Sequence, residues 1–214
     1  MVLWRRRSVP PPSPSVRHVP GVIPCAGESS RMGRPKALLD AGGRSFLSAV
    51  VGALVGGGCD PVLVVVAPEQ EEIVRKAEAA GAAVLVNPDP GEGPITSLRL
   101  VLERLGEDAP GVAFCPVDHP LLTAETVAQL LDAYRESETA LALPVVGEKR
   151  GHPVIFGPAL FPELKDPGLE GGARTVVHRH LDEALLIPVH DPGAVTDIDT
   201  PEQYRAAFFP GPPR

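Results

Sequence analysis

Two glycines and two cations in one short stretch of the sequence could bind phosphate groups. Residues 23–36 read IPCAGESSRMGRPK and follow a short apolar run directly. Gly27 and Gly33 allow backbone N–H groups to approach an anion closely, and Arg31 and Lys36 add two positive charges. This combination predicts a loop that holds a triphosphate and stabilises charge at the phosphorus under attack. An ordinary loop with solvated Arg and Lys side chains is the alternative.

Two further stretches supply carboxylates. Residues 115–122 read CPVDHPLL and place Asp118 at the end of a second apolar run, where it could hold Mg²⁺ while phosphate and water complete the octahedron. Residues 195–204 read VTDIDTPEQY, and in an extended segment Asp197 and Asp199 share one face, where a divalent ion could contact both. Asp118 could instead only order a turn, and one of the other two could only cap a helix.

The first stretch resembles the signature of the MobA-like nucleotidyltransferases. The matching residues are Ala26, Gly27, Ser29, Arg31, Met32, Gly33 and Lys36. Two residues depart from the pattern, because Pro24 stands where the family usually has Leu and Cys25 where it usually has Ala. Both departures lie where the strand joins the loop, so we expect them to affect the backbone path of the loop more than its chemistry.

The two acidic stretches resemble other segments of the same family. The first is similar to an Asp-x-Pro-Leu-Leu motif whose metal-binding Asp falls on Asp118. His119 replaces a residue that is often Gln or Thr there, and we expect it to have a supporting or purely structural role. The second is similar to Asp-Ile-Asp-Thr-Pro-Glu-Asp-Tyr, with Gln203 in place of the last acid. The resemblance implies Asp118 and Asp199 as ligands of Mg²⁺, with Asp197 as the further candidate.

Three weaker stretches fall where the family contacts its substrates. Residues 87–98 resemble the loop and helix start around the nucleotide base, which implies contacts from Gly93 and Ser97. Residues 150–156 resemble a Gly-His-Pro segment on the acceptor side, where His152 would contact the acceptor phosphate or be structural. Residues 171–174 resemble the end of a Gly-Asp-x-Gly-Ala-Arg motif, although Glu170 replaces its Asp and Leu169 its first Gly.

Alternating strands and helices must position these stretches. The apolar run at 62–66 lacks alternation, which is typical of a strand covered on both faces. Pro201 and Gln203 after Thr200 predict a capped final helix whose apolar side carries Tyr204, Ala207 and Phe208. We expect strands at 19–23, 61–67, 83–86, 111–115, 140–146, 152–156 and 185–189, and helices at 45–55, 69–80, 95–105, 123–135 and 171–181.

This order predicts an α/β fold with a doubly wound, mainly parallel, Rossmann-like sheet in a single domain. The domain is expected at 19–208, with nucleotide binding in its first half and acceptor binding in its second. Residues 1–18 and 209–214 are rich in Pro and Arg and are expected to be disordered tails.

Composition excludes several other classes of protein. A net charge of −7 over 214 residues argues against a broad nucleic-acid-binding surface. The three cysteines have no short spacing that would predict a zinc site or a disulfide framework. No apolar run approaches the ~20 residues of a membrane-spanning helix, so we expect a cytoplasmic protein without a membrane partner.

The resemblance implies a Mg²⁺-dependent enzyme that joins a nucleoside monophosphate to a phosphorylated acceptor and releases pyrophosphate. Arg31, Lys36 and Asp118 are then the catalytic residues. Ala26 resembles the Ala-Ala-Gly form of the CTP-using molybdopterin cytidylyltransferases. This resemblance favours CTP as the nucleotide and molybdopterin as the acceptor. It implies a molybdoenzyme or a chaperone as the protein partner. The alternatives are a guanylyl- or sugar-phosphate nucleotidyltransferase of the same fold, and a nucleotide-binding regulator without turnover.

Overall fold

The computed structural model describes residues 18–27, 34–91, 93–106 and 108–209. Its strands are β1 (Gly21–Pro24), β2 (Val62–Val66), β3 (Ala83–Val86), β4 (Val112–Phe114), β5 (Leu141–Val146), β6 (Lys149–Arg150), β7 (Val154–Phe156) and β8 (Leu185–Pro188). Its α-helices are α1 (Phe46–Gly56), α2 (Glu71–Ala79), α3 (Pro94–Leu105), α4 (Ala124–Arg135), α5 (Phe161–Lys165), α6 (Ala173–Arg179) and α7 (Pro201–Phe208). The predicted tails, apart from His18 and Phe209, lie outside the described residues.

The strands form one mixed, mostly parallel sheet in the order β3-β2-β1-β4-β7-β5-β6, with β8 beside β5. The first four strands of this order are parallel, and β8 is parallel to β5. β7 runs antiparallel to both of its neighbours, β4 and β5. The sequence predicts the mainly parallel sheet and seven of its eight strands. The short strand β6 and the reversed direction of β7 are additions to that prediction.

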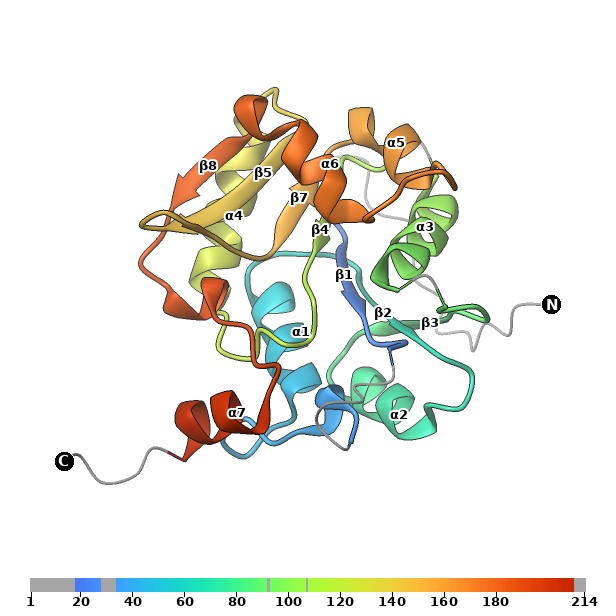
Figure 1. Ribbon diagram of the computed structural model, residues 1–214, viewed down its shortest axis with the longest axis vertical. Helices are drawn as coiled ribbons and strands as arrows, with labels where there is room; N and C mark the ends of the chain where they lie inside the picture. Colours follow the sequence, from blue (N-terminus) through green and yellow to red (C-terminus); the bar gives the residue numbers. More distant parts are fainter. Residues whose placement is uncertain (1–17, 28–33, 92, 107, 210–214) are drawn as a thin grey trace.

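Helices cover both faces of the sheet, as expected for a doubly wound fold (Figure 1). Ile23 and Val64 point to the face that packs against α1, α2 and α4. Val22 and Val65 point to the opposite face, which packs against α3, α5 and α6. Within the described ranges, none of the helices is long and apolar enough to cross a membrane.

The final helix α7 fixes the segment that carries Asp197 and Asp199. Thr200 and Gln203 form the predicted capping box at its start. Tyr204 and Phe208 pack on Phe46 of α1, with ring centroids 5.8 and 5.6 Å apart. The helix therefore holds the acidic segment against the first half of the chain.

Asp191 is a buried anchor that sequence analysis missed. One of its carboxylate oxygens accepts hydrogen bonds from the Thr123 backbone N–H at 3.0 Å and from the hydroxyls of Thr123 and Thr126 at 2.9 and 2.8 Å. The other oxygen accepts from the Gly193 N–H at 2.9 Å. These bonds join the start of α4 to the loop that leads toward Asp197.

Asp191→Ala should lower the free energy of unfolding by about 2 to 4 kcal/mol, because it leaves buried donors without their charged acceptor. Urea denaturation measures this loss. Asp182→Ala, at an exposed aspartate, serves as the matched control and should change stability by less than about 0.5 kcal/mol. Equal effects of the two substitutions would show that Asp191 is not an anchor.

Candidate active site

Lys36 lies between two carboxylates that the fold brings together. It sits in a short 3₁₀ helix, Lys36–Leu38, beyond the end of β1, and Asp118 follows β4, the parallel neighbour of β1. The Lys36 Nζ lies 3.3 Å from Asp118 Oδ2 and also donates to Asp199 Oδ1. The Ile198 N–H donates to the Asp118 carbonyl at 2.9 Å, which places Asp199 next to Asp118. The site is thus built from three distant segments.

The carboxylates keep Lys36 positively charged. Burial alone would lower the pKa of Lys36, but hydrogen bonding to Asp199 and the negative charges of Asp118 and Asp199 outweigh burial and raise that pKa. Only 15% of the Lys36 side chain is exposed, so its charge acts in a poorly hydrated setting where electrostatic attraction is strong. This arrangement gives the site a fixed cation.

The donor set fits a divalent cation such as Mg²⁺. Carboxylate oxygens are hard ligands, and Mg²⁺ commonly takes one or two of them together with substrate phosphates. Within the described part of the chain, no group of three acidic, His or Cys side chains forms a complete metal site. Asp118 and Asp199 meet at Lys36, whereas the Asp197 side chain is exposed.

A cavity of about 240 Å³ adjoins Lys36 and Asp118. Four of the residues predicted to bind the nucleotide line it: Ala26, Gly27, Gly93 and Ser97. Gly93 has φ +81° at the start of α3, which a side chain would strain. Ser97 is buried and lies 3.4 Å from the Asn87 amide nitrogen. The other predicted loop residues, Ser29, Arg31 and Gly33, lie outside the described residues.

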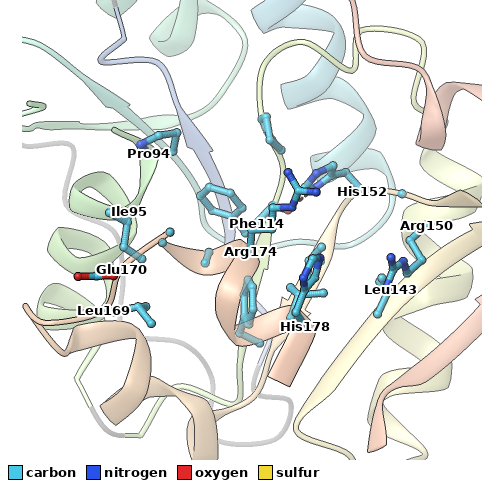
Figure 2. A pocket seen from close by; sticks show the side chains of 18 of the residues that line it. Pro94, Ile95, Phe114, Leu143, Arg150, His152, Leu169, Glu170, Arg174 and His178 are labelled. Carbon is cyan, nitrogen blue, oxygen red and sulfur yellow. Dashed lines mark hydrogen bonds between the residues drawn. The ribbon is translucent and has the colours of Figure 1, made fainter. Parts of the chain in front are cut away.

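A second, larger cavity of about 870 Å³ opens beside the first (Figure 2). The two cavities share Pro94 and Pro116 in their walls. The larger cavity is lined by parts of the stretches that resemble the family's acceptor side, namely residues 150–152 and 170–174. The site can therefore accommodate two ligands side by side, near the Lys36 cluster.

His152 packs against His119 in a tilted arrangement, with ring centroids 4.7 Å apart and an interplanar angle of 53°. Burial, together with the nearby His119, lowers the pKa of His152 to about 3, although its Nδ1 lies 3.4 Å from the Phe114 carbonyl oxygen. His152 is therefore neutral near pH 7 and could contact an acceptor phosphate only as an uncharged group. His119 in turn places Nε2 3.7 Å from Asp118 Oδ1. Nothing in the sequence indicates that these two rings meet.

The three cysteines are buried and free. Burial raises the pKa of the Cys25 and Cys115 thiols. Burial also raises the pKa of the Cys59 thiol, to about 12. Since the thiolate is the reactive form, we expect the native protein to react only slowly with a thiol reagent such as dithionitrobenzoate at pH 8. Once the protein is unfolded, all three cysteine thiols should react. Fast labelling of the native protein would contradict this burial.

Comparison with known proteins decides the family. Residues 21–184 match the MobA-like NTP transferase domain. The chain belongs to this family. The predicted family is confirmed, and so is the predicted fold class.

Two similar curated proteins have names that state different activities. A probable molybdenum cofactor guanylyltransferase of Mycolicibacterium paratuberculosis is 31% identical over 159 residues, which cover 73% of this chain and 77% of that protein. The nicotine blue oxidoreductase of Paenarthrobacter nicotinovorans is 29% identical over 193 residues, which cover 86% of this chain and 94% of that protein.

A solved structure of the Rv0371c protein of Mycobacterium tuberculosis superposes with a TM-score of 0.77 at 25% identity, covering 89% of this chain and 98% of that one. A nucleotidyl transferase from Methanothermobacter superposes with a TM-score of 0.75 at 18% identity, covering 90% and 97%. The second likeness concerns the fold alone. Both agree with a single α/β domain.

Proposed function

We propose that the chain transfers a nucleoside monophosphate from a nucleoside triphosphate to the phosphate of a molybdopterin-type acceptor, releasing pyrophosphate. The observation that carries this proposal is the placement of Lys36 between Asp118 and Asp199 beside two adjoining cavities. One cation and two carboxylates suit phosphate chemistry, and this favours transfer over the redox activity that names one relative. The names of the guanylyltransferase relatives support the acceptor.

In this proposal the triphosphate lies in the cavity lined by Ala26, Gly27, Gly93 and Ser97. Lys36, together with Arg31, neutralises charge on the β- and γ-phosphates. An oxygen of the acceptor phosphate forms a bond to the α-phosphorus, and the bond from that phosphorus to the bridging oxygen breaks as pyrophosphate leaves with the electron pair. The acceptor phosphate is already ionised near pH 7, since its second pKa is about 6, so no protein base is required.

Asp118 and Asp199 would hold the divalent cation, with Asp197 as the further candidate. When bound, such a cation screens the charges of the attacking and leaving oxygens. Mg²⁺ is the cation we propose, and a solved manganese complex of the Rv0371c protein supports a divalent ion in this fold. The two carboxylates orient Lys36 as well, so the cluster positions both positive charges.

Two observations point to different bases. Ala26 is buried in the wall of the nucleotide cavity and resembles the residue of the CTP-using branch, which favours CTP. The relatives named guanylyltransferases favour GTP. We propose CTP from the residue at the site, with GTP as the second candidate.

Thermal stability with Mg²⁺ and each of CTP, GTP, ATP and UTP tests this proposal, because a ligand that binds only the folded state raises the Tm. We expect the largest rise with CTP. A rise in Tm with GTP alone would leave the proposed reaction in place and show that the nucleotide is GTP, not CTP. The absence of a rise with any of the four nucleotides would contradict nucleotide binding.

A further inference from the structure

His119 is a buried histidine that the proposed reaction leaves without a role. It follows Asp118 directly in the chain, and its Nε2 lies 3.7 Å from Asp118 Oδ1. Its ring packs against the ring of His152. Polar side-chain atoms at this depth almost always have a hydrogen-bond partner, so both ring nitrogens of His119 need one.

A backbone carbonyl determines which ring nitrogen of His119 carries the proton. Nδ1 lies 3.4 Å from the Gly193 carbonyl oxygen, which can only accept, so Nδ1 donates. In the neutral ring, Nε2 is then unprotonated and presents a lone pair. Gly193 is held in place, because its N–H donates to the buried Asp191 at 2.9 Å and a Cβ at this glycine would lie 2.1 Å from the Leu121 carbonyl oxygen.

The Nε2 lone pair of His119 faces acceptors and not donors. Asp118 Oδ1 accepts hydrogen bonds itself, and 3.7 Å is too long for one. His152 supplies no proton, because its own Nδ1 donates to the Phe114 carbonyl oxygen at 3.4 Å and its lowered pKa of about 3 keeps the ring neutral. In the described ranges every fully buried polar side-chain atom has a hydrogen-bond partner, so Nε2, which has none, lies where a small ligand can reach it.

A nitrogen lone pair beside a carboxylate oxygen suits a metal ion. Two ligand atoms that each lie about 2.1 Å from one ion are about 3 to 3.5 Å apart, so the 3.7 Å between Nε2 and Asp118 Oδ1 has to close by only a few tenths. A histidine ligand almost always donates its other ring N–H to a carbonyl or carboxylate, as His119 does to Gly193. Lys36 makes its hydrogen bond to the other carboxylate oxygen, Asp118 Oδ2.

We propose that His119 Nε2 is a nitrogen ligand of the divalent cation held at Asp118, and that the site therefore binds Mn²⁺ more tightly than Mg²⁺. This inference rests on the proposed function for the presence of a cation at Asp118, to which it adds a ligand and an order of affinities. Imidazole suits transition metals, whereas Mg²⁺ takes mainly oxygen ligands. Mg²⁺ still binds the carboxylate, and substrate phosphates and water complete the coordination of either ion.

Mn²⁺ binding in the absence of nucleotide and acceptor tests this ligand. Electron paramagnetic resonance measures free Mn²⁺ during titration of wild type and His119→Asn, and competition gives the affinity for Mg²⁺. Asparagine can still donate to the Gly193 carbonyl but has no atom at the position of Nε2. We expect wild type to bind Mn²⁺ at least about tenfold more tightly than Mg²⁺. His119→Asn should lose at least about tenfold in Mn²⁺ affinity, while its Mg²⁺ affinity changes less than about threefold.

A spectroscopic signature tests the ligand in wild type itself. In protein with isotope-labelled histidine nitrogens, the pulsed paramagnetic resonance spectrum of bound Mn²⁺ should show coupling to a histidine nitrogen. His119→Asn should lack this coupling. His190→Asn, at an exposed histidine after β8, is the matched control and should keep both the coupling and the affinity. Circular dichroism checks that both variants are folded, and the wild-type spectrum decides even if His119→Asn is not.

Three results would overturn the nitrogen ligand. They are a bound Mn²⁺ without nitrogen coupling in wild type, a folded His119→Asn that keeps the coupling or the wild-type Mn²⁺ affinity, and a wild type that does not prefer Mn²⁺ to Mg²⁺. None of these measurements involves turnover. Failure of nucleotidyl transfer with every acceptor would therefore overturn the proposed function and leave the metal result intact, whereas absence of the coupling would leave the proposed function with carboxylate ligands alone.

Discussion

Asp118→Asn should lower kcat for nucleotidyl transfer by about 10²- to 10³-fold, the effect typical of removing one charge-stabilising group from an active site. Asparagine keeps the shape of the side chain but loses the negative charge that lies 3.3 Å from Lys36 and that a divalent cation would need. Pyrophosphate release in the presence of Mg²⁺ measures the loss. A variant with more than half of the wild-type rate would show that Asp118 only orders its turn.

Matched aspartate variants define the specificity of that result. Asp132→Asn removes an exposed carboxylate that pairs with Arg135 on α4 and should leave kcat unchanged. Asp199→Asn should cause a larger loss than Asp197→Asn, because Asp199 accepts a hydrogen bond from Lys36 whereas Asp197 is exposed. If Asp197→Asn caused the larger loss of kcat, Asp197 and not Asp199 would be the second carboxylate of the site.

Lys36→Met should lower kcat by about 10²-fold, since it removes the fixed cation that we propose neutralises the triphosphate. It should also have an effect in the absence of substrate. Without Lys36, Asp118 and Asp199 face each other uncompensated, so the variant should melt at a lower temperature than wild type without divalent ions. Added Mg²⁺ should then raise its Tm more than that of wild type.

Lys76→Met, at an exposed lysine of α2, is the control for the loss of one positive charge and should behave like wild type in both measurements. If Lys36→Met kept its activity and showed no greater response to Mg²⁺, the pairing of Lys36 with the two carboxylates would have no functional role.

The sequence predicts most of the fold because each element has a local cause. The continuous apolar run at Val62–Val66 forms the central strand β2, and the capping box after Thr200 begins α7. The reversal of β7 was not predictable, because an apolar strand has the same pattern whichever way it runs. The predicted helix at 171–181 was too long, since α6 ends at Arg179 and a 3₁₀ turn, Leu181–Glu183, follows.

The site was predictable where a residue lies at the end of a parallel strand. Asp118 follows β4, the neighbour of β1, so its position near the first loop follows from the sheet. The contact between Lys36 and Asp199 depends on α7 packing against Phe46, and the contact between the rings of His119 and His152 depends on the reversed strand β7. Such contacts between distant segments leave no local signal in a single sequence.

Pyrophosphate release is the measurement that tests the central claim most directly. Wild type, Asp118→Asn and Lys36→Met are each mixed with Mg²⁺, CTP or GTP, and molybdopterin. We predict that wild type releases pyrophosphate only when nucleotide, acceptor and Mg²⁺ are all present, and that both variants are at least about 10²-fold slower. A wild-type rate no higher than that of the two variants would contradict nucleotidyl transfer by this site and leave a nucleotide-binding protein without turnover.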